Sequence, residues 1–159
     1  MSSDITVTPI GVVRNHIQEA ADDIWADVIS RIDLDPARFT GGSLAGLADF
    51  SHVEILFVLH QVPEQEVVYE ARHPRGRQDF PKVGIFAQRG RMRPNRIGLT
   101  VCRLRRVSDL AIEVDGLDAV DGTPILDIKP YMQEFGPRGA VRQPQWSRDL
   151  MSTYWGKQA

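Results

Sequence analysis

The sequence predicts a mainly β protein whose antiparallel sheet closes, or nearly closes, into a barrel, with a few short helices. Short runs of strand character recur seven times along the 159 residues, and turn signals rich in Gly, Pro and Asp separate them. Segments with helical spacing are few. Many short strands with regular turns are typical of β-barrels. Because no repeat, linker or low-complexity stretch interrupts the pattern, we expect a single domain over residues 1–159.

The seven predicted strands differ in how their apolar residues are spaced. Residues 5–13 alternate around Pro9, which removes a ladder donor and places this strand at an edge or a bulge. Residues 17–25 are ambiguous, and the alternation over 26–34 favours a strand. Residues 55–59 form a continuous apolar run, which is typical of a central strand buried on both faces. The other four predicted strands cover 83–87, 97–101, 110–114 and 123–128, the last after a tight turn at Asp121-Gly122.

Helical structure is expected in two places. Residues 36–48 suit one or two short helical turns, and residues 144–156 form a C-terminal helical tail that begins near Pro144. Residues 63–82 are polar and rich in Pro and Gly, so we expect a long loop that is functional or mobile.

Charge is strongly segregated along a chain whose formal net charge is only −2. Residues 1–70 hold three basic and twelve acidic side chains, whereas residues 71–106 hold eleven basic and one acidic. Ten of those eleven are arginine, whose planar guanidinium suits bidentate recognition of phosphate. The block predicts an anionic partner, most simply nucleic acid. The alternative is that these arginines pair with the acidic first third, within the fold or across a dimer interface.

Composition and sequence motifs limit where the protein is expected to be located and which kinds of site it is expected to carry. No stretch is long and apolar enough to span a membrane, and the N-terminus lacks signal-peptide features, so we expect no membrane association and a cytoplasmic location. The single cysteine, Cys102, is expected to be a buried strand residue. The four histidines fall at unrelated spacings, so no metal site is expected. The glycine-rich phosphate loops, the nucleophile elbow and the paired-histidine zinc motif are absent.

Residues 84–99 concentrate candidate binding chemistry. This segment carries Arg89, Arg91, Arg93 and Arg96 between two apolar pieces of strand character. Strands hold such a loop in place while its side chains stay free to bind. The alternative is an ordinary solvated hairpin loop.

Asp127, Lys129 and Tyr131 share one face of an extended segment, because side chains alternate with a two-residue period. A carboxylate, an ammonium and a phenol on one face could bind or deprotonate a substrate. A structural ion pair beside a tyrosine is the alternative.

Several motifs occur together and in order between about residues 8 and 131. They are Ile10-Gly-Val-Val-Arg14, Gly46-Leu-Ala-Asp-Phe-Ser-His52, Gly84-Ile-Phe-Ala87 with Arg89, Arg93-Pro-Asn95, Ile97-Gly98 and Asp121-Gly-Thr-Pro-Ile-Leu-Asp-Ile-Lys-Pro-Tyr131. Together they resemble the TsaA-like (YaeB, TrmO) family. The resemblance implies a β-barrel that binds S-adenosylmethionine and works as a homodimer. It also implies methylation of the exocyclic amine of threonylcarbamoyl-adenosine beside the tRNA anticodon.

The resemblance further implies which residues form the site. Cofactor contacts are implied at Asn15, His16, Ile17, His52, Val53, Arg89, Leu99, Asp115, Gly116, Leu117 and Asp118. Asp127 or Tyr131 is then the candidate base, and Lys129 the group that stabilises developing negative charge. Contacts to tRNA are expected in the basic block, at Arg75, Arg77, Arg91, Arg93, Asn95 and Arg96. Two other functions stay open at this point: methylation of a small molecule or another RNA, and non-catalytic binding of S-adenosylmethionine.

Overall fold

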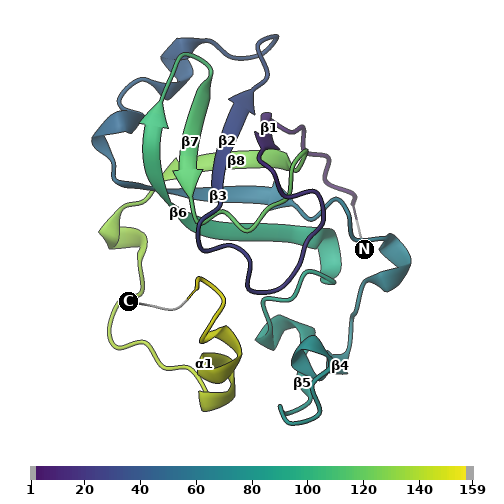
Figure 1. The fold of residues 1–159 in the computed structure, drawn as a ribbon. Coiled ribbons are helices and arrows are strands. Elements are labelled where there is room, and N and C mark those ends of the chain that lie inside the picture. The colour runs from purple at the N-terminus through teal and green to yellow at the C-terminus, as the bar shows by residue number, and fades with distance from the viewer. Residues whose placement is uncertain (1–2, 157–159) are drawn as a thin grey trace.

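Six strands of the computed structural model close into an antiparallel barrel, so the predicted fold class is confirmed. The structure describes residues 3–156. Around the barrel the strands follow the order β1-β2-β7-β6-β3-β8, and β8 pairs in turn with β1. Figure 1 shows the barrel above, with the small β4-β5 ribbon and the C-terminal helix α1 below it. The strands are β1 (Gly11–Arg14), β2 (Ile29–Leu34), β3 (His52–Val58), β4 (Ala71–Arg72), β5 (Val83–Gly84), β6 (Ile97–Val107), β7 (Ala111–Asp115) and β8 (Pro124–Pro130).

Apolar side chains fill the barrel interior with the two-residue period of its strands. Val53, Ile55 and Phe57 of β3 are buried, whereas the residues between them are only partly buried. The expectation that residues 55–59 are buried on both faces is therefore wrong. A sheet that closes on itself has one interior face, so the unbroken apolar run of β3 makes part of the outer surface apolar as well.

The longest strand, β6, is shared between two neighbours. Its first part pairs with β3 over residues 97–103, and its second part pairs with β7 over residues 103–107. Glycine is needed at position 98, because a Cβ there would lie 2.4 Å from the Phe57 ring. Within the described chain, residues 97–102 thus have a strand neighbour on one side only. Their other edge leaves main-chain groups available to side chains or to a ligand.

The arginine-rich segment is not a hairpin loop between paired strands. β5 is shorter than the strand predicted over 83–87. It pairs with β4, which lies inside residues 63–82, the stretch predicted to be a loop. A 3-10 helix follows β5 directly, and β6 pairs with β3 instead. The buried Gln88 fastens this ribbon, because its Nε2 donates to the main-chain oxygens of Arg72 and Val83 at 3.1 and 2.8 Å. The segment therefore links the ribbon to the barrel.

Other predicted strands and turns are present, although some have different bounds from those predicted. The first strand begins at Gly11 rather than at residue 5, and β2, β7 and β8 lie at the predicted strands. The turn at Asp121-Gly122 is confirmed, with Gly122 at a φ of 78°. Cys102 is a buried residue of β6, as predicted.

Helical structure in residues 3–156 is limited to short pieces. α1 covers Gln145–Met151, which is shorter than the tail predicted over 144–156. After α1 the chain returns to the barrel, where Tyr154 packs against Trp25, Val28 and Val120. No helix of this part is long and apolar enough to cross a membrane. The 3-10 helices are Gly41–Leu44, Leu47–Asp49, Glu64–Glu66, Pro74–Gly76, Ile85–Ala87, Pro94–Arg96 and Gln133–Phe135.

Candidate functional site

The open edge of β6, residues 97–102, gathers several of the predicted cofactor residues. Arg89 lies on this edge, because its Nη2 donates to the main-chain oxygen of Leu99 at 2.5 Å. Thr100 Oγ1 donates to Oδ1 of Asp118, and the Cys102 thiol lies 3.7 Å from the main-chain oxygen of Gly116. The chain that leaves β7 therefore runs beside the open edge of β6. A guanidinium, a carboxylate and main-chain polar groups come together there.

Asn15 links the loop after β1 to residues 119–121, which follow the predicted cofactor residues Asp115 to Asp118. Its Nδ2 donates to Ser30 Oγ and to the main-chain oxygen of Ala119, both at 2.8 Å. Its Oδ1 accepts from the main-chain N–H of Ile17 at 2.9 Å, and its own N–H donates to Asp121 Oδ1 at 3.1 Å. Asn15 thus holds residues 15–17 next to residues 119–121, and the exposed His16 lies in this loop.

Two of the predicted cofactor residues point into the core. The side chains of Val53 and Leu117 are fully buried, so only their main-chain atoms could face a ligand. His52, in contrast, is exposed at the start of β3. Strand register sets His52 opposite Arg103 of β6, and Arg103 opposite Asp115 of β7.

Two of the three predicted catalytic residues, Asp127 and Lys129, are in contact on β8, apart from the open edge of β6, and Tyr131 follows the end of that strand. Lys129 Nζ lies 2.6 Å from Asp127 Oδ2, and both side chains are exposed. The hydrogen bond that Lys129 donates to Asp127 raises the pKa of Lys129, so the amine stays protonated. The main-chain N–H of Tyr131 donates to the oxygen of His52 at 3.0 Å. β3 lies between β8 and β6, so the strands β8 and β6 are about 10 Å apart in the same chain, which is two strand spacings.

The predicted RNA-binding arginines fall into two groups. Arg75 forms a bidentate pair with Asp23 at 3.0 and 3.2 Å and approaches Asp22, and Arg77 pairs with Asp79. The others donate to main-chain oxygens: Arg91 to Ala20, Arg93 to Gln88 and Arg96 to Val62.

The pairing of Arg75 with Asp22 and Asp23 is the internal pairing with the acidic first third that the charge pattern left open. Asn95 and Arg96 both have positive φ, at 62° and 49°, a conformation that non-glycine residues adopt rarely.

Two polar residues that the sequence did not point to hold Asp118. Thr100 is a buried residue of β6, and Tyr154 comes from the tail, where it donates from its hydroxyl to Asp118 Oδ2 at 2.6 Å. Tyr154 lies in the predicted helical tail over residues 144–156, and nothing in the sequence signals that this tail returns to residue 118. A polar residue inside the apolar alternation of β6 was the one available signal for Thr100.

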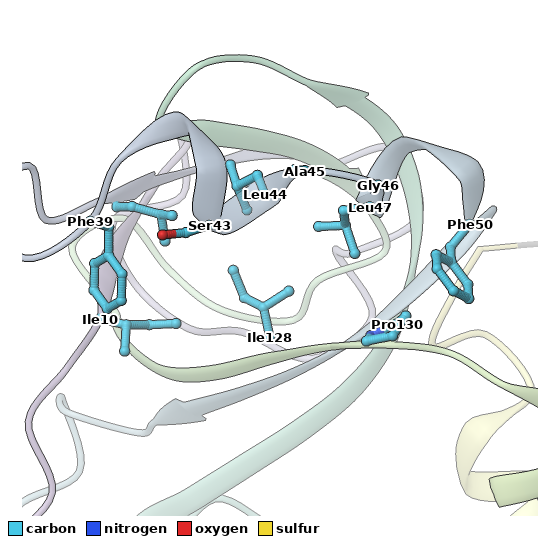
Figure 2. A pocket seen from close by; sticks show the side chains of 11 residues that line it. Ile10, Phe39, Ser43, Leu44, Ala45, Gly46, Leu47, Phe50, Ile128 and Pro130 are labelled. Atoms are coloured by element: carbon cyan, nitrogen blue, oxygen red, sulfur yellow. The ribbon is translucent and has the colours of Figure 1, made fainter.

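Two pockets lie near the barrel ends. The larger, about 390 Å³, is mainly apolar and lies between the short helices before β3 and the strand β8. Figure 2 shows Leu44 and Leu47 facing Ile128 across it, and no predicted site residue lines it. The smaller, about 250 Å³, is more polar and is lined by Asp118 and Arg91 among others. Residues 3–156 contain no cluster of three or more His, Cys, Asp or Glu side chains placed to hold a metal ion.

Sequence and fold relate this chain to known proteins. Residues 20–136 match the family model described as tRNA-methyltransferase O N-terminal domain. The chain is similar to the tRNA (adenine(37)-N6)-methyltransferase of Mus musculus, at 45% identity over 93 residues, which are 58% of this chain and 21% of that protein. It is also similar to a probable S-adenosyl-L-methionine-binding protein of Methanothermobacter thermautotrophicus, at 34% identity over 140 residues, or 86% of this chain and 96% of that protein.

A solved structure has a similar barrel. TrmO from Pseudomonas aeruginosa superposes with a TM-score of 0.68 at 30% identity, over 88% of this chain and 62% of that one. The chain therefore spans about a fifth of the length of the mouse relative and about three fifths of the solved structure.

Proposed function

The chain belongs to the family of the tRNA-methyltransferase O N-terminal domain, and we therefore propose that it is an S-adenosylmethionine-dependent methyltransferase. Its proposed substrate is the exocyclic amine of threonylcarbamoyl-adenosine beside the tRNA anticodon. The observation that carries the proposal is the convergence of Arg89, Leu99 and Asp118 at the open edge of β6. The names of the mouse and archaeal relatives, a tRNA methyltransferase and a binder of S-adenosylmethionine, support it.

The groups at the open edge of β6 fit the chemistry of S-adenosylmethionine. Arg89 suits the methionine carboxylate, because a guanidinium matches a carboxylate bidentately. Asp118 is an acceptor for the ribose hydroxyls, and the main chain of Leu99 offers polar groups for the adenine. Bound S-adenosylmethionine would supply an electrophilic methyl group on its sulfonium. The protein must then hold the acceptor amine in line with that methyl group, since alignment accounts for much of the acceleration in such transfers.

The outer face of β8 is the proposed place of proton transfer. A carbamoylated amine is a weak nucleophile, so a base within hydrogen-bond reach of its proton would accelerate the reaction. Asp127 is an exposed carboxylate on β8 and Tyr131 follows the end of that strand, so they are the candidates. Lys129 remains positive and would stabilise negative charge on the carbamoyl oxygen. Strand spacing keeps this face about 10 Å from β6 within one chain, and we propose that a second copy of the chain brings the two together.

A homodimer is therefore part of the proposal. Ile97, Leu99 and Val101 alternate along the outer face of β6 and are 44%, 43% and 47% exposed. Neighbouring exposed apolar side chains commonly mark an interaction surface, and a two-fold axis would cover this row with its own copy. Val101→Asp should convert a dimer into a monomer in sedimentation experiments. A wild-type monomer at micromolar concentration would contradict the dimer.

We propose that tRNA contacts the arginines whose charge is not neutralised by a carboxylate in the described structure. Arg91, Arg93 and Arg96 are of this kind, whereas Arg75 and Arg77 are ion-paired. Asn95 lies between Arg93 and Arg96, and its positive φ is a conformation that asparagine tolerates better than most residues do. A tRNA substrate would also place the protein in the cytoplasm.

Transfer of a labelled methyl group from S-adenosylmethionine to tRNA tests the proposed activity. The tRNA should carry the threonylcarbamoyl group, and the same tRNA without that group is the matched control. We expect label in the first and background in the second. Tight binding of S-adenosylmethionine with no transfer to any RNA would leave a binding protein, the property named for the archaeal relative.

A further inference from the structure

Residues 153–155, which follow α1, are held against the chain around the proposed cofactor residues Gly116 and Asp118. Tyr154 donates to Asp118 at 2.6 Å, and Thr153 Oγ1 donates to Asp23 at 3.1 Å. Trp155 lies near Gly116, where a Cβ would be 3.8 Å from the indole ring. The Tyr154 ring packs against Trp25, Val28 and Val120. Three consecutive residues thus contact the loop before β2 and the chain that follows β7.

Both oxygens of Asp118 are held by hydroxyl groups from different elements. Thr100 on β6 donates to Oδ1, and Tyr154 on the tail donates to Oδ2. Two donors on two oxygens fix the rotation of the carboxylate, while each oxygen keeps a further lone pair for another donor. Burial and the neighbouring Asp118 charge raise the pKa of the Tyr154 phenol, so its hydroxyl remains a donor throughout the ordinary pH range.

We propose that Tyr154 is a positioning residue of the cofactor site, which orients Asp118 to accept the ribose hydroxyls of S-adenosylmethionine. This inference rests on the proposed function, because Asp118 must contact the cofactor. Tyr154 lies beyond residues 20–136, the part that matches the family model, so the assignment comes from the contacts of this chain. Fixing a binding group in advance strengthens binding, because less conformational freedom is lost when the ligand arrives.

Tyr154→Phe tests the role of the hydroxyl without removing the ring from its apolar cluster. Titration calorimetry with S-adenosylmethionine should show an affinity weakened on the order of tenfold, because a hydrogen bond to a charged group is lost. Tyr69→Phe is the matched control: Tyr69 is 71% exposed, and its loss of a hydroxyl should leave the affinity unchanged. Thermal unfolding of each variant reports whether the fold is kept.

A double-variant cycle separates positioning from general structural support. If Tyr154 acts through Asp118, Tyr154→Phe should weaken binding in the wild type but have no further effect in Asp118→Ala. Equal effects in both backgrounds would overturn the proposal. Unchanged or tighter binding by Tyr154→Phe would also overturn it. Tighter binding would mean that the tail covers the site and inhibits binding. If the wild type binds no S-adenosylmethionine, the proposed function fails together with this inference. If it binds and Tyr154→Phe binds equally well, the inference fails alone.

Discussion

Arg89 donates a hydrogen bond from Nη2 to the main-chain oxygen of Leu99 at 2.5 Å. The two residues are not strand partners, since Leu99 pairs with Leu56 of β3. The contact instead brings a charged side chain from the arginine-rich segment to the open edge of β6. It distinguishes Arg89 from Arg91, Arg93 and Arg96, whose guanidinium groups donate to the main-chain oxygens of Ala20, Gln88 and Val62 instead.

Arg89→Ala should weaken the binding of S-adenosylmethionine by about ten- to a hundredfold, because a charge-assisted contact to its carboxylate is lost. Arg38→Ala is the matched control, since Arg38 also donates to a main-chain oxygen, that of Pro9 at 2.8 Å. Titration calorimetry measures both variants. Equal affinities for Arg89→Ala and the wild type would remove Arg89 from the site.

Lys129→Ala and Tyr131→Phe should lower kcat for methyl transfer while the affinities for both substrates stay close to those of the wild type. Their proposed roles are confined to the transition state, and such residues affect kcat rather than binding. Lys82→Ala and Tyr69→Phe serve as matched controls for the loss of a charge and of a hydroxyl. A rise in KM at constant kcat would reassign both residues to substrate binding.

Arg91→Ala should weaken tRNA binding and reduce the salt dependence of that binding by about one unit of the logarithmic slope, as loss of one phosphate contact does. Arg75→Ala should change the slope less, because Asp22 and Asp23 already neutralise this side chain in the fold. Filter binding over a range of salt concentrations measures the slopes. The reverse order of the two effects would show that the ion pair opens when tRNA binds.

Asp23→Asn should lower the free energy of unfolding at neutral pH by about 1 kcal/mol, the upper range for a partly exposed ion pair. Asparagine is the suitable substitution, because Asp23 has a φ of 60° and asparagine tolerates this conformation. The hydrogen bond from Arg75 lowers the pKa of Asp23 below its ordinary value of 3.8.

The sign of the pH dependence follows from that shift. Because the pKa is lower in the folded state than in the unfolded chain, the stabilisation is fully present above 3.8 and is lost as the pH falls through the lowered value. The difference between the wild type and Asp23→Asn, measured by urea unfolding, should therefore vanish in strong acid. A difference that persists there would mean that the carboxylate acts through something other than its charge.

Alternation along the strands was enough to predict the barrel, because the two-residue period directly reports which side chains face a shared interior. Ile32 and Leu34 illustrate this, since both belong to the alternation over residues 26–34 and both are buried. The continuous apolar run over residues 55–59 was misleading about the outer face, because sequence cannot distinguish a second buried face from an exposed apolar row. Strand pairing could not be predicted either. β5 pairs with β4 rather than with β6, and this pairing depends on the path of the chain and not on local spacing.

The same distinction between local spacing and the path of the chain applies to the candidate site. Asp127 and Lys129 are neighbours on one face because they are two residues apart, so local periodicity predicted their contact. The bond between Tyr154 and Asp118 spans 36 residues and depends on where the tail folds back, so no local pattern could predict it. Arg75 shows the limit of charge counting, since three-dimensional contacts decide which arginines are already paired.

The location of the cofactor site is tested most directly by following the main-chain amide signals of the ¹⁵N-labelled protein during titration with S-adenosylmethionine. The largest shifts are expected at Leu99, Gly116 and Asp118, and the Nε signal of Arg89 should move with them. Shifts confined to the apolar pocket around Leu44 and Ile128, or no shifts at saturating S-adenosylmethionine, would contradict a cofactor site at the open edge of β6.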